Sequence, residues 1–376
     1  MKNSPVKIVY LIDHLKSGGA QRSLYLLVRE LDKKKYAPYI VSLGSDGDED
    51  YSRKFKQIKV DVKVYNANKI NTLFVLVNFY FLLLREKPDI IHTFLFHSDI
   101  VGRFLGGLTR VPIIISSIRG FDLWKKPWHY ALSRFTARFT SKITGVSREH
   151  IDFSIKNEGI KPEQAVRIPN GVDLASLKQD NNCTQLKKEL KIREDFLVVG
   201  FVGRLVIDKA LDCLINAARA IVRQHPETMF LLVGDGPIRS ELQKLVTDNG
   251  LDDNFMFLGF RDDIMQLLSI LDVFVLPSIH EGSSNALLEA MAMKKAVVVT
   301  EVGGNKEAVN KECGMLVPPQ DEKALTSAIC KLLESCDLRQ ALGEAAGKRI
   351  RENFSLDRMV MSYQHLYEEL LADHRT

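Results

Sequence analysis

The chain has 376 residues, of which 45% are hydrophobic and 26% are charged, and its formal net charge is +5 at pH 7. These values are ordinary for a soluble globular protein and give enough length for two domains with full cores. The five cysteines are odd in number and form no C-x-x-C pair, which excludes a disulfide-stapled scaffold and predicts reduced thiols in a cytoplasmic protein.

Apolar runs alternate with helical patterns along both halves of the chain, which predicts a doubly wound parallel sheet in each half. In the first half we expect strands at residues 7–12, 39–43, 60–65, 89–92, 112–116, 142–146 and 165–168. In the second half we expect strands at residues 196–202, 228–233, 254–258, 272–276, 296–300 and 314–317.

The linker between the two halves is expected near residues 172–182, where a turn is followed by a polar stretch. Residues 356–371 have the apolar spacing of an amphipathic helix. We therefore expect an N-terminal domain at residues 1–175, a C-terminal domain at residues 183–355 and a final helix at residues 356–376.

Positive charge is concentrated in the first half. Residues 1–180 contain 29 Lys and Arg against 18 Asp and Glu, whereas residues 181–376 contain 23 against 29. Residues 70–84 carry no charge but are too few to cross a bilayer, so we expect a buried helix, with contact to a membrane surface as a second role. Residues 119–142 mix aromatic and basic side chains. They suit either an interfacial helix on anionic lipid or a helix packed inside the domain, and no nucleic-acid motif accompanies them.

Two loops of the first half carry candidate binding residues. Gly18 and Gly19 follow the first expected strand and precede a helix near Ala20, so they form either an anion cradle or only a tight turn. His92 and His97 follow a later strand. Two histidines five residues apart do not share a helix face, and no carboxylate or thiol spacing completes a metal site, so no metal is expected.

Gly203, Arg204 and Lys209 follow the first expected strand of the second half. Two cations at the end of a buried strand can neutralise a diphosphate and stabilise its charge as it leaves. The alternative is a pair of solvated basic residues beside a turn.

The segment from Glu281 to Ala292 joins a small-residue loop to a helix that starts at the carboxyl end of a buried strand. Its binding candidates are Gly282, Ser283, Ser284, Asn285 and Glu289. Either serine can cap the helix, whose first free N–H groups and dipole then favour a diphosphate. We expect Asn285 and Glu289 on one accessible helix face, opposite the apolar residues, where Glu289 can accept hydrogen bonds from ribose hydroxyls.

Glu281 and Glu289 lie in the pattern Pro-Ser-x-x-Glu-Gly-x-x-x-x-x-Leu-Glu-Ala-Met-Ala, which resembles the retaining glycosyltransferases of family 4. The resemblance implies the GT-B fold, an α/β fold of two facing Rossmann-like domains with a C-terminal helix that crosses back to the first domain. It also implies a nucleotide sugar held by the C-terminal domain, retention at the anomeric carbon and no metal ion.

The resemblance further implies roles for individual residues. Arg204 and Lys209 match the family's diphosphate-binding pattern, and Gly18 and Gly19 match its glycine loop. Arg261 lies where the family contacts the base, with a solvated side chain as the alternative. His97 is implied to contact the donor sugar or the acceptor hydroxyl, and His92 is the alternative match. One residue departs from the pattern, because Ala210 replaces the usual Gly; a positive φ there would cost roughly 1 kcal/mol.

The expected activity is transfer of a sugar from a nucleoside-diphosphate sugar, with UDP favoured, to a glycan or lipid-linked acceptor in bacterial surface polysaccharide or lipopolysaccharide synthesis. The expected catalytic residues are Glu281, His97, Arg204 and Lys209, with no cofactor and no nucleic acid. We expect a cytoplasmic protein whose basic N-terminal domain rests on the anionic inner membrane face. The alternatives are a GT-B-fold epimerase, which needs acid and base carboxylates, and a non-catalytic nucleotide-sugar-binding protein.

Overall fold

The computed structural model describes residues 4–44, 51–68, 70–120, 124–177 and 183–374, which form two compact units. The first unit contains the residues up to Gly171 together with those from Leu356 onward, and the second contains Val172–Ser355. Val172 belongs to the second unit, within which its N–H donates to the Phe354 carbonyl at 2.8 Å. Residues 178–182 of the expected linker lie outside the described residues.

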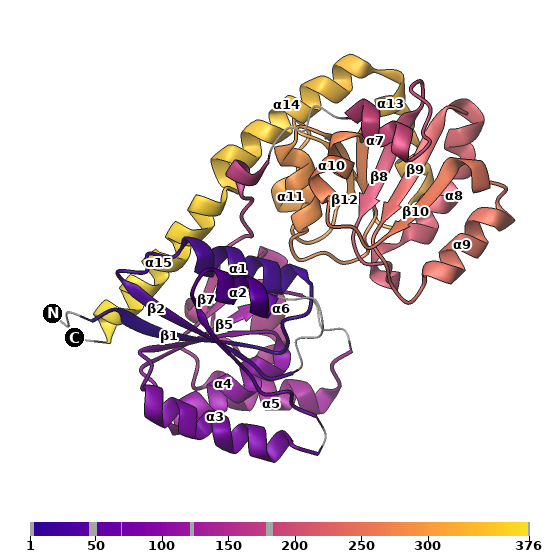
Figure 1. Cartoon of the computed structure of the whole chain (residues 1–376). Helices are drawn as coiled ribbons and strands as arrows, with labels where there is room; N and C mark the ends of the chain where they lie inside the picture. The colour runs from indigo at the N-terminus through magenta and orange to yellow at the C-terminus, as the bar shows by residue number, and fades with distance from the viewer. Residues whose placement is uncertain (1–3, 45–50, 69, 121–123, 178–182, 375–376) are drawn as a thin grey trace. The chain divides into compact units, whose positions relative to one another are not determined.

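The first unit has a seven-stranded parallel sheet in the order β3-β2-β1-β4-β5-β6-β7 (Figure 1). Its strands are β1 Val6–Ile12, β2 Tyr36–Ser42, β3 Asp61–Val64, β4 Ile90–Phe94, β5 Ile113–Ile118, β6 Lys142–Gly145 and β7 Ala165–Arg167. Its helices are α1 Gly19–Glu30, α2 Tyr51–Gln57, α3 Thr72–Glu86, α4 Phe96–Leu108, α5 Pro127–Ala137, α6 Arg148–Glu158 and α15 Leu356–Asp373.

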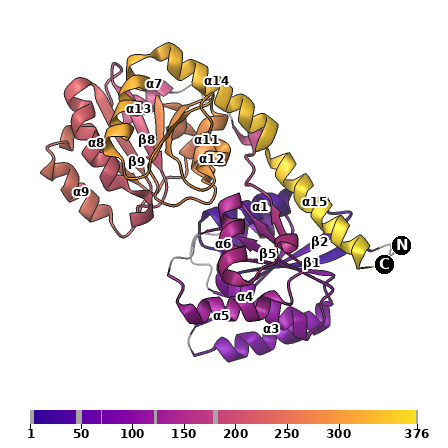
Figure 2. The same cartoon turned by 180° about the vertical axis from the view of Figure 1, so that it is seen from behind.

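Helices cover both faces of this sheet, and the alternation of side chains along β1 shows the two cores. Ile8, Tyr10 and Ile12 pack in one core with α1, α2 and α15, whereas Val9 and Leu11 pack in the other with α3 and α4. Figures 1 and 2 show these helices on opposite sides of the sheet. The expected return of the final helix to the first domain is confirmed by α15.

The expectation of a buried helix at residues 70–84 is wrong in one respect. A helix forms, α3, and buries Val75 and Phe79, but Leu73, Phe74 and Phe81 are 75%, 68% and 62% exposed. The segment is apolar all round, and its sheet covers only one side of the helix. Residues 119–142 combine features of both expectations: α5 packs one face into the domain through residues such as Ser133 and Ala137, whereas Trp124 and Trp128 are exposed.

The second unit has a six-stranded parallel sheet in the order β10-β9-β8-β11-β12-β13. Its strands are β8 Leu197–Val202, β9 Thr228–Val233, β10 Phe255–Gly259, β11 Val273–Leu276, β12 Ala296–Thr300 and β13 Met315–Val317. Its helices are α7 Cys183–Glu189, α8 Leu211–Gln224, α9 Arg239–Asp248, α10 Ile264–Ser269, α11 Asn285–Ala292, α12 Asn305–Ala308, α13 Glu322–Glu334 and α14 Cys336–Asn353. Every expected strand is therefore present. Within the described part of the chain, no helix has the length and apolar character needed to cross a membrane.

In both sheets the strand order reverses at one position. β1 lies beside β4 in the first unit, and β8 lies beside β11 in the second. Loops that leave adjacent strands at such a point diverge to opposite faces, and ligands of open α/β sheets bind in the crevice between them. These two positions are where candidate site residues should lie.

Candidate active site

At the carboxyl ends of β8 and β11, the structure brings Lys209 and Glu281 together. The Lys209 ammonium donates to Glu281 Oε2, which also accepts from Ser278 Oγ at 3.3 Å. The N–H of Ile279 donates to the Asp208 carbonyl at 2.8 Å, so the two loops are joined through their main chains. The Lys209 and Glu281 side chains are 19% and 10% exposed, so this ion pair is partly desolvated.

Arg204 lies in the loop after β8, five residues before Lys209, and its side chain is exposed. The end of β9 and the turn after it fix the backbone there, because Gly203 N donates to Val233 O at 2.9 Å and Leu205 N donates to Asp235 O at 3.0 Å. The turn after β9 permits this approach only with glycine: Gly234 has φ +125°, and a Cβ there would lie 2.0 Å from the Gly203 carbonyl oxygen. The loop that carries Arg204 is thus held from its main chain, while the guanidinium stays at the surface.

Ala210 has φ +46° and ψ +46°, directly before α8. The position that carries Gly in the resembling family therefore does need a left-handed backbone here. Ala adopts it at a cost of about 1–2 kcal/mol. Lys209 and α8 meet at this strained residue.

The helix α11 starts at the carboxyl-end loop of β11, and of the two serines it is Ser284 that caps it. Ser284 Oγ accepts from Leu287 N at 3.2 Å. Gly282 is buried in the preceding loop, and Ser283 and Asn285 are half-buried. The remaining N–H groups of the first turn and the positive end of the helix dipole make this loop suitable for a phosphate.

The expectation that Glu289 is accessible is wrong. The residue is only 3% exposed, close to the values of Leu287, Leu288 and Met291. The helix wheel placed Glu289 away from these residues, but α11 is packed against β12 on one side and α14 on another. A carboxylate at this depth requires hydrogen-bond donors, so Glu289 is not a solvated surface group.

Two glycines after β12 also belong to this site and were missed from the sequence. Gly304 N donates to Glu281 O at 3.0 Å. A Cβ on Gly303 would lie 1.7 Å from the Glu281 carbonyl oxygen, and one on Gly304 would lie 2.0 Å from that of Gly282. The available signal was a Gly-Gly pair just after an expected strand, the same signal that drew attention to Gly18 and Gly19.

Arg261 is not brought to this group. It follows β10, which β9 separates from β8. Its guanidinium donates to both carboxylate oxygens of Asp263, at 2.7 and 2.5 Å. These hydrogen bonds raise the pKa of Arg261 and lower that of Asp263. The Arg261 guanidinium is thus already paired with the Asp263 carboxylate.

In the first unit, His97 lies where β1 and β4 end. Its Nδ1 is 2.8 Å from Asp13 Oδ2, and the N–H groups of His97 and Ser98 donate to the same carboxylate at 3.3 and 2.7 Å. The Trp124 ring is stacked parallel to the imidazole, with 5.9 Å between centroids. The His97 side chain is still 65% exposed. Asp13 thus orients an accessible histidine, and its position directly after β1 was the signal that could have revealed it.

The turn before α4 is strained, because Leu95 has φ +76°. Such a backbone costs about 1–3 kcal/mol in a non-glycine residue and persists only where surrounding contacts hold it. The carboxylate of Asp13, which accepts two N–H groups of the first turn, supplies such contacts. The strain coincides with the residue that sets the position of His97.

His92 cannot contact a ligand. It is fully buried, with Nδ1 2.7 Å from Tyr367 Oη and Nε2 2.7 Å from Ser117 Oγ. Burial, together with the nearby Arg119, holds the pKa of His92 well below its ordinary value, so its ring is neutral. Of the two histidines, only His97 is accessible.

Gly18 and Gly19 lie at the start of α1, as expected, but Gly18 has φ 178°, an extended backbone open to any residue. A Cβ there would meet the movable end of the Gln21 side chain at 2.5 Å. The backbone conformation at residue 18 therefore does not require glycine.

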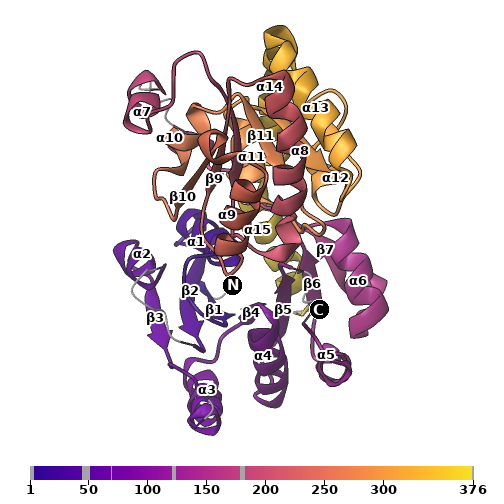
Figure 3. The same cartoon turned by 90° about the vertical axis from the view of Figure 1, so that its right-hand side faces the viewer.

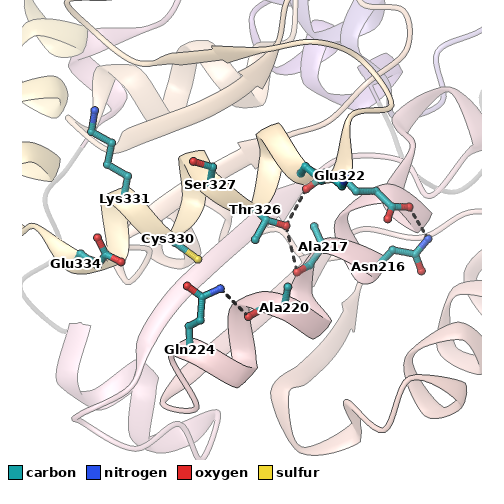
Figure 4. Close-up of a pocket in the computed structure, with 11 residues that line it drawn as sticks. Asn216, Ala217, Ala220, Gln224, Glu322, Thr326, Ser327, Cys330, Lys331 and Glu334 are labelled. Carbon is teal, nitrogen blue, oxygen red and sulfur yellow. Dashed lines mark hydrogen bonds between the residues drawn. The ribbon is translucent and has the colours of Figure 1, made fainter.

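A groove of about 640 Å³ lies elsewhere, between α8 and α13 (Figure 4). Its polar groups bond to one another: Asn216 Nδ2 donates to Glu322 Oε1 at 2.8 Å, and Thr326 Oγ1 donates to the Glu322 carbonyl at 2.7 Å. It contains none of the candidate residues.

Comparison with known proteins agrees with this geometry. Residues 17–176 match the family model described as Glycosyltransferase Family 4, and residues 197–335 match that described as Glycosyl transferases group 1. The chain is 29% identical over 319 residues, 82% of each chain, to the Escherichia coli UDP-Gal:alpha-D-GlcNAc-diphosphoundecaprenol alpha-1,3-galactosyltransferase. It is 27% identical to the Staphylococcus aureus capsular polysaccharide biosynthesis glycosyltransferase CapM, over 99% of both chains.

Among solved structures, Anabaena HepE in complex with UDP and glucose has a TM-score of 0.87, with 22% identity, 97% of this chain covered and 100% of that one. This likeness shows the fold, and the expected GT-B architecture is confirmed. The two family matches together cover most of both units, and the two relatives, matched over 82% and 99% of their length, are named as sugar-transferring enzymes. The chain belongs to the glycosyltransferases of family 4.

Proposed function

We propose that this protein transfers a sugar from a UDP-sugar to a lipid-linked or glycan acceptor in bacterial surface polysaccharide synthesis, with retention of anomeric configuration and without a metal ion. One observation carries the proposal. Arg204, Lys209 and the capped start of α11 lie in the loops at one switch point, so two cations and a helix N-terminus serve one anionic group. The names of the E. coli relative and of HepE complexes point to UDP.

Retention without a covalent intermediate fits the state of Glu281. Its carboxylate accepts from Lys209 and from Ser278, and both bonds lower its capacity to act as a nucleophile. We therefore assign Glu281 to the hydroxyls of the donor sugar. The acceptor attacks the face that the diphosphate leaves, a β-phosphate oxygen takes the acceptor proton, and Arg204 and Lys209 stabilise the departing charge.

The acceptor belongs, in this proposal, to the first unit, with His97 held by Asp13 as the residue nearest the acceptor hydroxyl or donor sugar. A lipid-linked acceptor is consistent with the diphosphoundecaprenol substrate named for the E. coli relative. It places the enzyme in the cytoplasm, on the inner face of the membrane.

The test is nucleoside-diphosphate release from a panel of UDP-, GDP- and ADP-sugars by the purified chain, with and without EDTA. We expect slow hydrolysis of one UDP-sugar, unchanged by EDTA, and NMR of the first-formed product should show the anomeric configuration of the donor. Release only from GDP- or ADP-sugars, activity restored by added metal, or an inverted product would each overturn the matching part of the proposal.

A further inference from the structure

The first unit has an exposed apolar face on the side of its sheet that α3, α4 and α5 cover. On α3, the exposed residues are Leu73, Phe74, Val77, Phe81 and Leu84. At 100° per residue these five lie within an arc of about 100°. The buried residues of the same helix lie opposite, against the core that contains Val9 and Leu11. The exposed side of α3 therefore points away from the sheet.

The neighbouring helices extend this face. Phe104 and Leu108, one turn apart on α4, are exposed, as are Trp128 and Phe135 on α5. α4 packs beside both α3 and α5. Figure 3 shows the three helices side by side along one edge of the unit. Single exposed apolar residues are ordinary, but such a set on three neighbouring helices marks an interaction surface.

Basic residues accompany the apolar face. Residues 70–142 contain ten Lys and Arg and four Asp and Glu. The three of these acidic residues that the structure describes, Glu86, Asp89 and Asp99, are buried or half-buried. Exposed cations remain at the ends and on the surface of the helices: Lys87, Arg110, Lys126, Arg134 and Arg138. The Arg138 guanidinium lies 3.9 Å from the centroid of the exposed Phe135 ring.

We propose that this face docks the first unit onto an anionic lipid bilayer, with the α3 residues entering the acyl boundary and the basic residues contacting lipid phosphates. Both tryptophans of the chain, Trp124 and Trp128, lie in this region, and tryptophan favours the membrane–water boundary. A second copy is a poorer occupant, since a twofold contact would oppose one basic surface to the same basic surface. This docking rests on the proposed function only in that a lipid-linked acceptor would be held in the same bilayer. Binding of the first unit to lipid requires no catalytic turnover.

The experiment is co-sedimentation of the full chain with vesicles of phosphatidylglycerol and phosphatidylethanolamine, and with vesicles of phosphatidylcholine alone. We expect binding to the anionic vesicles that weakens as salt increases. Phe74→Ser/Phe81→Ser should weaken it about tenfold or more, because two apolar anchors are lost. Met361→Ser is the matched control, because Met361 is an equally exposed apolar residue on α15 and should leave binding unchanged. The Arg110→Gln/Arg138→Gln variant should bind the anionic vesicles more weakly than the parent chain does. Its behaviour with phosphatidylcholine vesicles should equal that of the parent chain.

Thermal unfolding and calorimetric titration with UDP confirm that each variant is folded. Failure of the parent chain to bind anionic vesicles, or equal binding by the double phenylalanine variant, overturns the proposal. A dimer seen by light scattering that the same variant dissociates would assign the face to a second copy instead. If the parent chain binds anionic vesicles but does not bind UDP, the proposed function fails and the docking proposal stands. Failure of vesicle binding and failure of UDP binding are therefore distinguishable.

Discussion

Replacement of Lys209 by Met and of Glu281 by Gln, singly and together, tests whether the two side chains act as one unit. An exposed ion pair contributes about 0.2–1 kcal/mol, whereas removal of one partner from a fully buried pair costs about 3–5 kcal/mol. With side chains 19% and 10% exposed, this pair lies between the two cases. Each single variant should therefore lose about 1–3 kcal/mol of unfolding free energy. The double variant should lose about as much as one single variant, so the coupling equals one single loss, about 1–3 kcal/mol.

The assay is urea unfolding followed by circular dichroism. Both tryptophans lie in the first unit, so the urea midpoint of their fluorescence is an internal control. The substitutions at Lys209 and Glu281 should leave this midpoint unchanged. Lys294→Met and Glu344→Gln form the matched cycle, because this 2.9 Å ion pair of the same unit is much more exposed. Its coupling should stay below about 0.5 kcal/mol. Strictly additive losses for Lys209 and Glu281, equal to those of the exposed pair, would refute the argument that partial burial makes them interdependent.

Three further outcomes are expected. Arg204→Ala should lower transfer by about a hundredfold or more without a change in unfolding free energy, because its side chain is exposed and stabilises only the leaving charge; steady-state kinetics with urea unfolding decides this. Ala210→Gly should be less destabilising than Ala217→Gly by about 1–2 kcal/mol, since both alanines are buried but only Ala210 has a positive φ, and equal losses in urea would contradict it. Burial raises the pKa of the Asp99 carboxyl to about 7. Because the unfolded value is about 3.9, its stabilising contribution is complete below about pH 4 and is lost as the pH rises through 7. Asp99→Asn should therefore remove the fall in unfolding free energy between about pH 4 and 7, and an unchanged slope in that range would exclude this cause.

The strands were predictable because parallel sheets buried on both faces require continuous apolar runs, such as residues 228–233 and 296–300. The exposure of α3 was not, because an apolar helix segment shows only that some face is buried. Whether a second layer covers the other face depends on the number of elements the rest of the chain supplies. The same reason explains Glu289: the helix wheel describes α11 alone, whereas its burial comes from β12 and α14.

The pairing of side chains at the switch points shows where prediction from sequence stops. Strand order places the loops after β1 and β4 on the two sides of one crevice, and likewise those after β8 and β11. The contact between Asp13 and His97 spans 84 residues, and that between Lys209 and Glu281 spans 72, so no local pattern specifies either. A carboxylate that accepts two helix N–H groups and one imidazole nitrogen fixes the ring in a single orientation. The orientation of His97 therefore depends on Asp13, and an assignment of the first unit's site to His97 alone would omit the group that positions it.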